Sequence, residues 1–112
     1  MHDQAQYVVI TKAQVKEGQI ETVVELFEKT NPALVKNQPD WLEAVLTADA
    51  QSNEVTVLAY WRSSESYKKF SNAPEFTKTM QQFMPYLTEP PSVSINTILV
   101  GMTQSSIWRY GL

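Results

Sequence analysis

The chain of 112 residues contains no cysteine and a single histidine. Without cysteine it can form no disulfide framework, no nucleophilic thiolate and no thiolate-ligated metal or iron–sulfur site. The histidine, His2, stands next to the first residue, so no histidine in the body of the chain is available as a catalytic base or as an axial haem ligand. No Ser-His-Asp, Cys-His, metal-ligand or phosphate-loop pattern is present.

Long apolar runs and an excess of positive charge are also missing. No segment has the length of apolar sequence that crosses a bilayer, and the first residues lack the basic start and apolar run of a signal peptide. Nine basic residues are scattered among twelve acidic ones, for a net charge of -3, which argues against nucleic acid as a partner. We therefore expect one soluble, cytoplasmic domain over residues 1–112, with neither a nucleic-acid nor a membrane partner.

Hydrophobic residues recur along the chain with two different periods. Alternation indicates strands, and the i, i+3, i+4, i+7 spacing within residues 20–27 indicates an amphipathic helix. Pro32 should end or kink that helix, or the helix continues for one more turn through 34–35. The predicted strands cover 6–15, 41–49, 54–62 and 92–102, and the later helices begin near Ser63 or Ser64 and near Pro74, the last closed by Pro85.

The resulting order of elements is β, α, β, β, α, β. It predicts an α+β domain of the ferredoxin-like class: a four-stranded antiparallel sheet with its helices on one face and a core over 6–102.

The second face of this sheet should also be apolar, which is unusual for a monomer. Pairing of two copies through their sheets would bury it, so we expect a homodimer. The tail, 103–112, carries Trp108 and Tyr110 and either lies at the interface or folds back over its own sheet. Ten residues cover only part of that face, which favours the interface. The residues expected on the second face are Val8, Ile10, Leu58, Tyr60, Ile98 and Val100.

Three segments resemble the antibiotic-biosynthesis-monooxygenase (ABM) family. They are QPDWL (38–42), which leads into the predicted hairpin, AYWRSSESY (59–67) and NAPEF (72–76). The resemblance extends over about 6–102 and implies a ferredoxin-like subunit of a dimeric α+β barrel.

Some members of that family oxidise aromatic polyketides to quinones without a cofactor. Their pocket uses a tryptophan at a strand end and an aromatic hydroxyl six residues later, which match Trp61 and Tyr67 here. The resemblance thus implies these two as catalytic residues, no cofactor, and a small hydrophobic aromatic or quinone-like ligand. Two family positions differ: the asparagine four residues before the tryptophan is Val57, and the arginine of the last helix falls near Gln81 or Gln82.

Five further residues are predicted to line the substrate pocket: Thr11, Val57, Phe70, Met80 and Phe83. Members of the family that degrade haem use asparagine, tryptophan and histidine at the positions of Thr11, Phe70 and Met80, so haem degradation is not expected. In the alternative interpretation, Trp61 and Tyr67 are core residues. The protein would then be a non-catalytic dimeric module for ligand binding or stress response.

Overall fold

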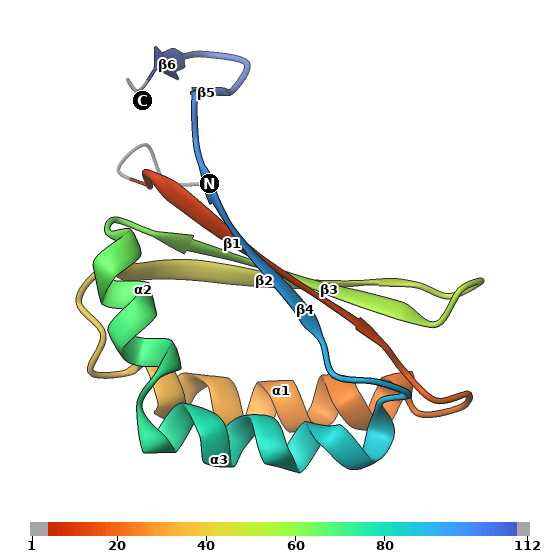
Figure 1. The fold of residues 1–112 in the computed structure, drawn as a ribbon. Coiled ribbons are helices and arrows are strands. Elements are labelled where there is room, and N and C mark those ends of the chain that lie inside the picture. The colour runs from red at the N-terminus through yellow and green to blue at the C-terminus, as the bar shows by residue number, and fades with distance from the viewer. Residues whose placement is uncertain (1–4, 110–112) are drawn as a thin grey trace.

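In the computed structural model, which describes residues 5–109, four strands form one antiparallel sheet in the order β2-β3-β1-β4. Helices α1 and α3 cover one face of this sheet, and α2 stands at one end, between β3 and α3 (Figure 1). This confirms the predicted ferredoxin-like α+β fold. The elements are β1 (Tyr7–Gln14), α1 (Ile20–Val35), β2 (Trp41–Asp49), β3 (Glu54–Trp61), α2 (Ser64–Ser71), α3 (Pro74–Phe83), the 3₁₀ turn η1 (Met84–Tyr86), β4 (Ser92–Thr97), β5 (Val100–Met102) and β6 (Ile107–Arg109).

Helix α1 continues past Pro32 and ends at Val35. Proline removes one intrahelical hydrogen bond, but its ring is exposed here. The last turn is held by burial, because Leu34 and Val35 pack in the same core cluster as Trp61. Of the two outcomes that the sequence left open, the continued helix is the one that forms.

The two later helices begin where the sequence predicts. Ser63 caps α2, with its hydroxyl oxygen accepting a hydrogen bond from the backbone N–H of Ser66 at 3.2 Å. Pro74 occupies the first turn of α3, where the missing N–H is not needed by the helix. Helix α2 buries Tyr67 and Phe70, whereas α3 has no fully buried residue.

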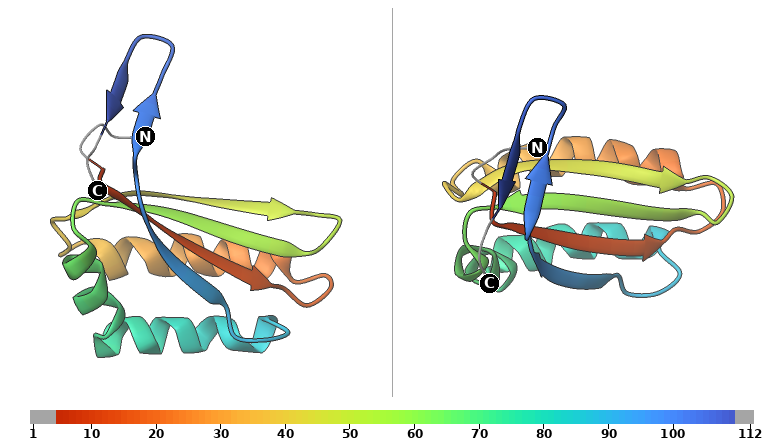
Figure 2. Two further views of the ribbon diagram at one scale, coloured as in Figure 1. Left: turned by 45° about the horizontal axis from the view of Figure 1, so that its top comes forward. Right: turned by 90° about the horizontal axis from the view of Figure 1, so that it is seen from above.

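The predicted strand 92–102 is wrong in its second half. β4 ends at Thr97, and β5 pairs with β6 in a separate two-stranded hairpin. The reason lies in the register: Thr97 pairs with Tyr7, the first residue of β1, so the chain beyond it has no neighbouring strand. The hairpin stands away from the main sheet (Figure 2).

The tail therefore does not lie flat on its own sheet over its described part. Trp108 packs instead against Gly101 of the same hairpin, so closely that a Cβ at residue 101 would lie 2.3 Å from the indole ring. Tyr110 lies outside the described residues. Large apolar side chains on the hairpin remain exposed, with Met102 at 62% and Ile107 at 68%.

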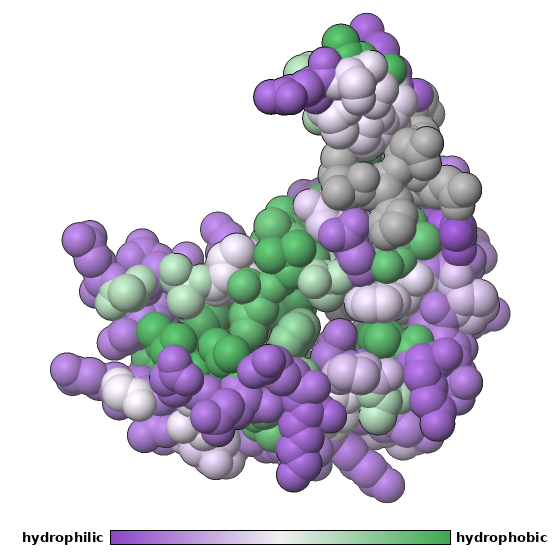
Figure 3. Space-filling model, turned by 180° about the vertical axis from the view of Figure 1, so that it is seen from behind, coloured by the Kyte–Doolittle hydropathy of each residue, from purple (hydrophilic) through white to green (hydrophobic). Residues whose placement is uncertain are grey.

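The face of the sheet opposite the helices is apolar along β1, β2 and β3. Val8 pairs with Tyr60 and Ile10 with Leu58, as expected, and the neighbouring Val45 of β2 is 42% exposed. Apolar side chains also form a continuous band on the surface seen from the side of β2 and α1 (Figure 3).

The fourth strand does not extend this apolar face, which corrects the prediction. Ile98 is buried after the end of β4, and Val100 belongs to the hairpin. The pleat of β4 places Ser92, Ser94 and Asn96 on this face instead, opposite Lys12, Ile10 and Val8. The apolar stripe is thus confined to β1, β2 and β3. Within residues 5–109, no helix is long and apolar enough to cross a membrane.

Candidate functional site

The core consists of two separate clusters with a cavity between them. One contains Trp61, Tyr67 and Phe70, and the other contains Val23 and Leu87. The cavity has a volume of about 310 Å³ and is lined by residues of both clusters. Protein interiors normally contain few voids larger than a water molecule, so a space of this size is a candidate ligand site.

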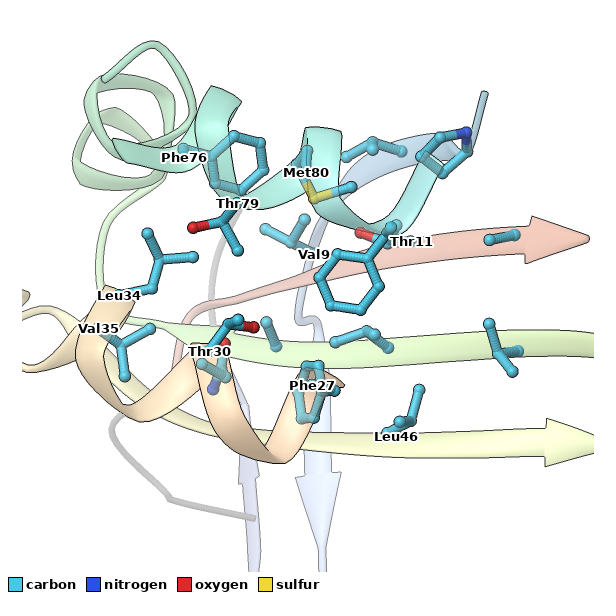
Figure 4. Close-up of a pocket in the computed structure, with 18 of the residues that line it drawn as sticks. Val9, Thr11, Phe27, Thr30, Leu34, Val35, Leu46, Phe76, Thr79 and Met80 are labelled. Atoms are coloured by element: carbon cyan, nitrogen blue, oxygen red, sulfur yellow. The ribbon is translucent and has the colours of Figure 1, made fainter. Parts of the chain in front are cut away.

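Three elements build most of the cavity wall (Figure 4). The sheet supplies the floor through the side chains that alternate toward the helices, such as Val9 and Thr11 of β1. Helix α1 supplies one wall at the helical spacing i, i+3, i+4, i+7, and α3 supplies the opposite wall. The residues at this spacing are Phe27, Thr30, Asn31 and Leu34 on α1 and Phe76, Thr79, Met80 and Phe83 on α3, and α1 also contributes Val23 and Val35.

Trp61 is the last residue of β3, lines the cavity and is 1% exposed. Its ring centroid lies 5.6 Å from that of Tyr67 in an edge-on arrangement and 5.2 Å from that of Phe70. Its indole Nε1 is buried and has no hydrogen-bond partner in the protein. A buried donor without a partner is energetically unfavourable and rare in folded proteins. Among the described residues Nε1 of Trp108 is the other example, but of the two tryptophans only Trp61 lines the cavity.

Tyr67 lies on α2 and is 7% exposed. Burial raises the pKa of its phenol above the usual value of 10, because removal from water disfavours the charged phenolate. At neutral pH the hydroxyl therefore keeps its proton. It can donate a hydrogen bond, but it cannot act as a base.

The remaining polar groups of the cavity are uncharged. They belong to Thr11, Thr30, Asn31 and Thr79. The hydroxyl of Thr30 donates to the backbone oxygen of Leu26 at 2.8 Å, which leaves its oxygen able to accept. Among the cavity-lining residues within 5–109 there is no Asp, Glu, Lys, Arg or His.

All seven predicted site residues line this cavity. The structure thus brings the tryptophan–tyrosine pair together with Thr11, Val57, Phe70, Met80 and Phe83, while their functional roles stay predictions. Gln81 and Gln82, near the position of the family's arginine, are exposed and lie outside the lining.

The sequence reasoning missed the contribution of α1 to the site. The apolar stripe that ends at Phe27 extends by helical spacing to Thr30, Asn31 and Leu34, so the same pattern that predicted the helix also indicated these positions. On α3, Thr79 was missed because a threonine beside Met80 gives no hydrophobic signal.

A metal centre built from the usual ligands is not found in the part of the chain that the structure describes. No three His, Cys, Asp or Glu side chains gather there. His2 lies outside the described residues.

The model of the antibiotic biosynthesis monooxygenase family matches residues 6–82. This segment includes the sheet strands β1 to β3 and all but the last residue of α3. The chain therefore belongs to the antibiotic biosynthesis monooxygenase family, as its sequence motifs indicated. No curated protein matches the chain.

Solved structures with the same fold come from several organisms. A monooxygenase of Streptomyces coelicolor, in complex with the ligand nanaomycin D, has a TM-score of 0.80 at 20% identity, with 91% of this chain and 95% of that chain covered. A conserved protein of Methanosarcina mazei has a TM-score of 0.71 at 14% identity, with 84% and 93% covered. A protein of Mycobacterium tuberculosis has a TM-score of 0.66 at 16% identity, with 91% and 100% covered. At these identities the likeness establishes the fold.

Proposed function

We propose that this protein is a monooxygenase that uses dioxygen to convert a hydrophobic aromatic compound into a quinone-like product without a cofactor. The observation that carries the proposal is the buried, unpaired indole N–H of Trp61 beside Tyr67, in the wall of an otherwise apolar cavity. Membership of the antibiotic biosynthesis monooxygenase family supports the same class of reaction.

The proposed reaction needs no external reductant. An activated methylene between two aromatic rings transfers its proton to water as the substrate enters the cavity, and the resulting carbanion is stabilised by delocalisation onto the carbonyl oxygen of the substrate. The carbanion reduces dioxygen and forms a C–O bond to give a hydroperoxide, which loses water to leave a carbonyl. One oxygen atom of dioxygen enters the product and the other leaves as water, so the four electrons that reduce dioxygen all come from the substrate.

In this scheme the protein binds, orients and excludes water. Trp61 Nε1–H and the Tyr67 hydroxyl donate hydrogen bonds to the substrate oxygen on which negative charge develops, and such donors act strongly in a dry site. Thr11, Val57 and Phe70 position the rings, together with Met80 and Phe83 on the α3 wall. No cavity-lining carboxylate or histidine within residues 5–109 competes as a base, so the acidity of the substrate controls the first step.

The test is oxygen consumption by the purified protein with anthrones and hydroquinones, without added flavin, haem or metal. We expect uptake above the rate of autoxidation, and a loss of that excess in Trp61→Phe and Tyr67→Phe. Tyr86→Phe is the matched control, because Tyr86 lies in η1, outside the cavity lining and outside the open face of the sheet. Unchanged uptake in both cavity variants would show that the site assignment is wrong.

A non-catalytic binding module is the second candidate. It is favoured by the two positions at which the polar residues of the family are replaced, Val57 in the floor and Gln81 or Gln82 outside the cavity. It predicts that quinones bind in the cavity while no anthrone or hydroquinone is oxidised above the background rate.

We also propose that the protein acts as a homodimer joined through its sheets. The apolar stripe formed by Val8, Ile10, Val45, Leu58 and Tyr60 lies on the face that the helices leave open, and exposed apolar patches of this kind mark interfaces. We expect light scattering after gel filtration to give twice the chain mass. Leu58→Lys should yield monomers and the exposed helix variant Thr77→Lys should not; a monomeric wild-type protein would contradict the proposal.

A further inference from the structure

The cavity combines several hydrogen-bonding groups with a complete lack of charge among its described lining residues. Hydroxyls of Thr11, Thr30 and Thr79 come from three different elements, β1, α1 and α3, and surround the same space (Figure 4). Trp61 and Tyr67 also line it. Such a set can satisfy a ligand oxygen, but it offers no counter-charge to an ion.

The threonine hydroxyls can form hydrogen bonds with a ligand, because the protein itself does not use all of their donor and acceptor capacity. Within residues 5–109, the hydroxyls of Thr11 and Thr79 form no hydrogen bond with the protein. That of Thr30 uses its proton on the Leu26 oxygen and can still accept. A ligand hydroxyl could therefore donate to Thr30, and a ligand carbonyl could accept from Thr79.

The same surroundings disfavour the binding of a charged ligand. A carboxylate taken from water into this cavity would lose its hydration and find only neutral hydrogen-bond donors, with no cation in the lining to balance its full charge. The lysine of α3, Lys78, is exposed and lies outside the cavity lining, as do the neutral Gln81 and Gln82. The wall of α1 is equally uncharged, with Asn31 as its most polar residue.

We propose that the cavity selects neutral, oxygen-bearing aromatic ligands over their anionic counterparts, and that Thr30 and Thr79 are specificity-determining residues that bond a ligand oxygen between the two helices. The inference rests on the proposed function in that it names the substrate class of the same site. The inference concerns ligand binding alone. It can therefore be wrong for a protein that is an active oxygenase, and it can be right for a protein that catalyses no reaction.

The decisive experiment compares two ligands of nearly the same shape, anthraquinone-2-carboxamide and anthraquinone-2-carboxylate, by calorimetry at neutral pH. We expect the carboxamide to bind at least about tenfold more tightly, since only the carboxylate carries a charge into the cavity. Equal or tighter binding of the carboxylate would overturn the inference. Oxygen uptake is not part of this measurement, so the failure of the oxygenase proposal would leave its result intact.

Two variants of Thr79 test the named residue. Thr79→Arg places a cation on the α3 wall and should increase carboxylate affinity at least about tenfold, whereas Gln81→Arg, the same charge change at an exposed position of that helix, should not. A folded Thr79→Arg protein with no gain would count against the role of Thr79. Thr79→Val keeps the shape of the side chain and replaces its hydroxyl by a methyl group; we expect a loss of about threefold to tenfold in carboxamide affinity. Unchanged affinity would contradict the proposed bond, whether or not the arginine variant folds.

Discussion

Replacing Trp61 by phenylalanine tests whether this residue is kept for stability or for binding. The substitution removes two buried carbons and the indole nitrogen from a side chain that is 1% exposed. Loss of the carbons should destabilise the fold by about 0.8 kcal/mol each. Removal of the buried N–H, which has no partner in the protein, should stabilise it by about 1–3 kcal/mol. The two effects oppose each other.

We therefore expect the free energy of unfolding of Trp61→Phe to lie within about 1.5 kcal/mol of the wild-type value. Trp61→Ala, which removes the whole ring system, should destabilise the fold by about 3–5 kcal/mol. It provides the value with which Trp61→Phe is compared. Both values can be measured by urea unfolding followed by circular dichroism, which does not depend on the tryptophan signal.

The same variant should bind a neutral quinone less tightly. Loss of one neutral hydrogen bond corresponds to about 0.5–1.5 kcal/mol, or roughly a twofold to twelvefold higher Kd by calorimetry. Near-neutral stability combined with weaker binding would identify Nε1 as a group that is satisfied by the ligand. The reasoning is refuted if Trp61→Phe costs as much stability as Trp61→Ala, or if the affinity does not change.

Three further predictions concern the hairpin, the pocket tyrosine and the helix cap. Gly101→Ala should displace Trp108, since the new Cβ would lie 2.3 Å from its ring; hydrogen exchange should then rise in 100–109 but not in the main sheet. Because burial raises the pKa of Tyr67 in the folded state, the folded chain holds a proton that the unfolded chain loses above pH about 10. Stability should fall as the pH rises past that point, and Tyr67→Phe should make the fall in urea midpoint shallower; an equally steep fall would count against the buried phenol. Ser63→Ala removes the cap of α2 and should lower the free energy of unfolding by about 1 kcal/mol in the same assay.

The fold could be predicted from the sequence because its signals are local. Alternation in the strands, the apolar stripe of 20–27, and the positions of Ser63 and Pro74 each specify an element without reference to the rest of the chain. The end of β4 could not be predicted in this way. It depends on where β1 begins, at Tyr7, and the alternation within 92–102 carries no information about whether a neighbouring strand is present.

The site residues could be predicted at positions that a family motif or an apolar spacing identifies. Trp61 and Tyr67 stood out through the family motif, and Phe70, Met80 and Phe83 through their apolar spacing, and all five line the cavity. The cavity itself was not predictable. Whether facing apolar side chains fill the space between helices and sheet or leave it open depends on the distance between the layers, which no sequence pattern encodes.

The walls of the cavity differ in how firmly they are held. Its floor is a sheet in which β1 and β3 are each hydrogen-bonded on both sides, and α1 and α2 are anchored by Val23, Val35, Tyr67 and Phe70. Helix α3 has no fully buried residue and meets the two core clusters through the partly buried Phe76 and Phe83, so it is the least firmly anchored of the three helices. A change in the shape of the cavity therefore costs the least free energy where α3 forms the wall. We expect ligands of different thickness to be accommodated by movement of this helix, while the strands keep a fixed template for the rings.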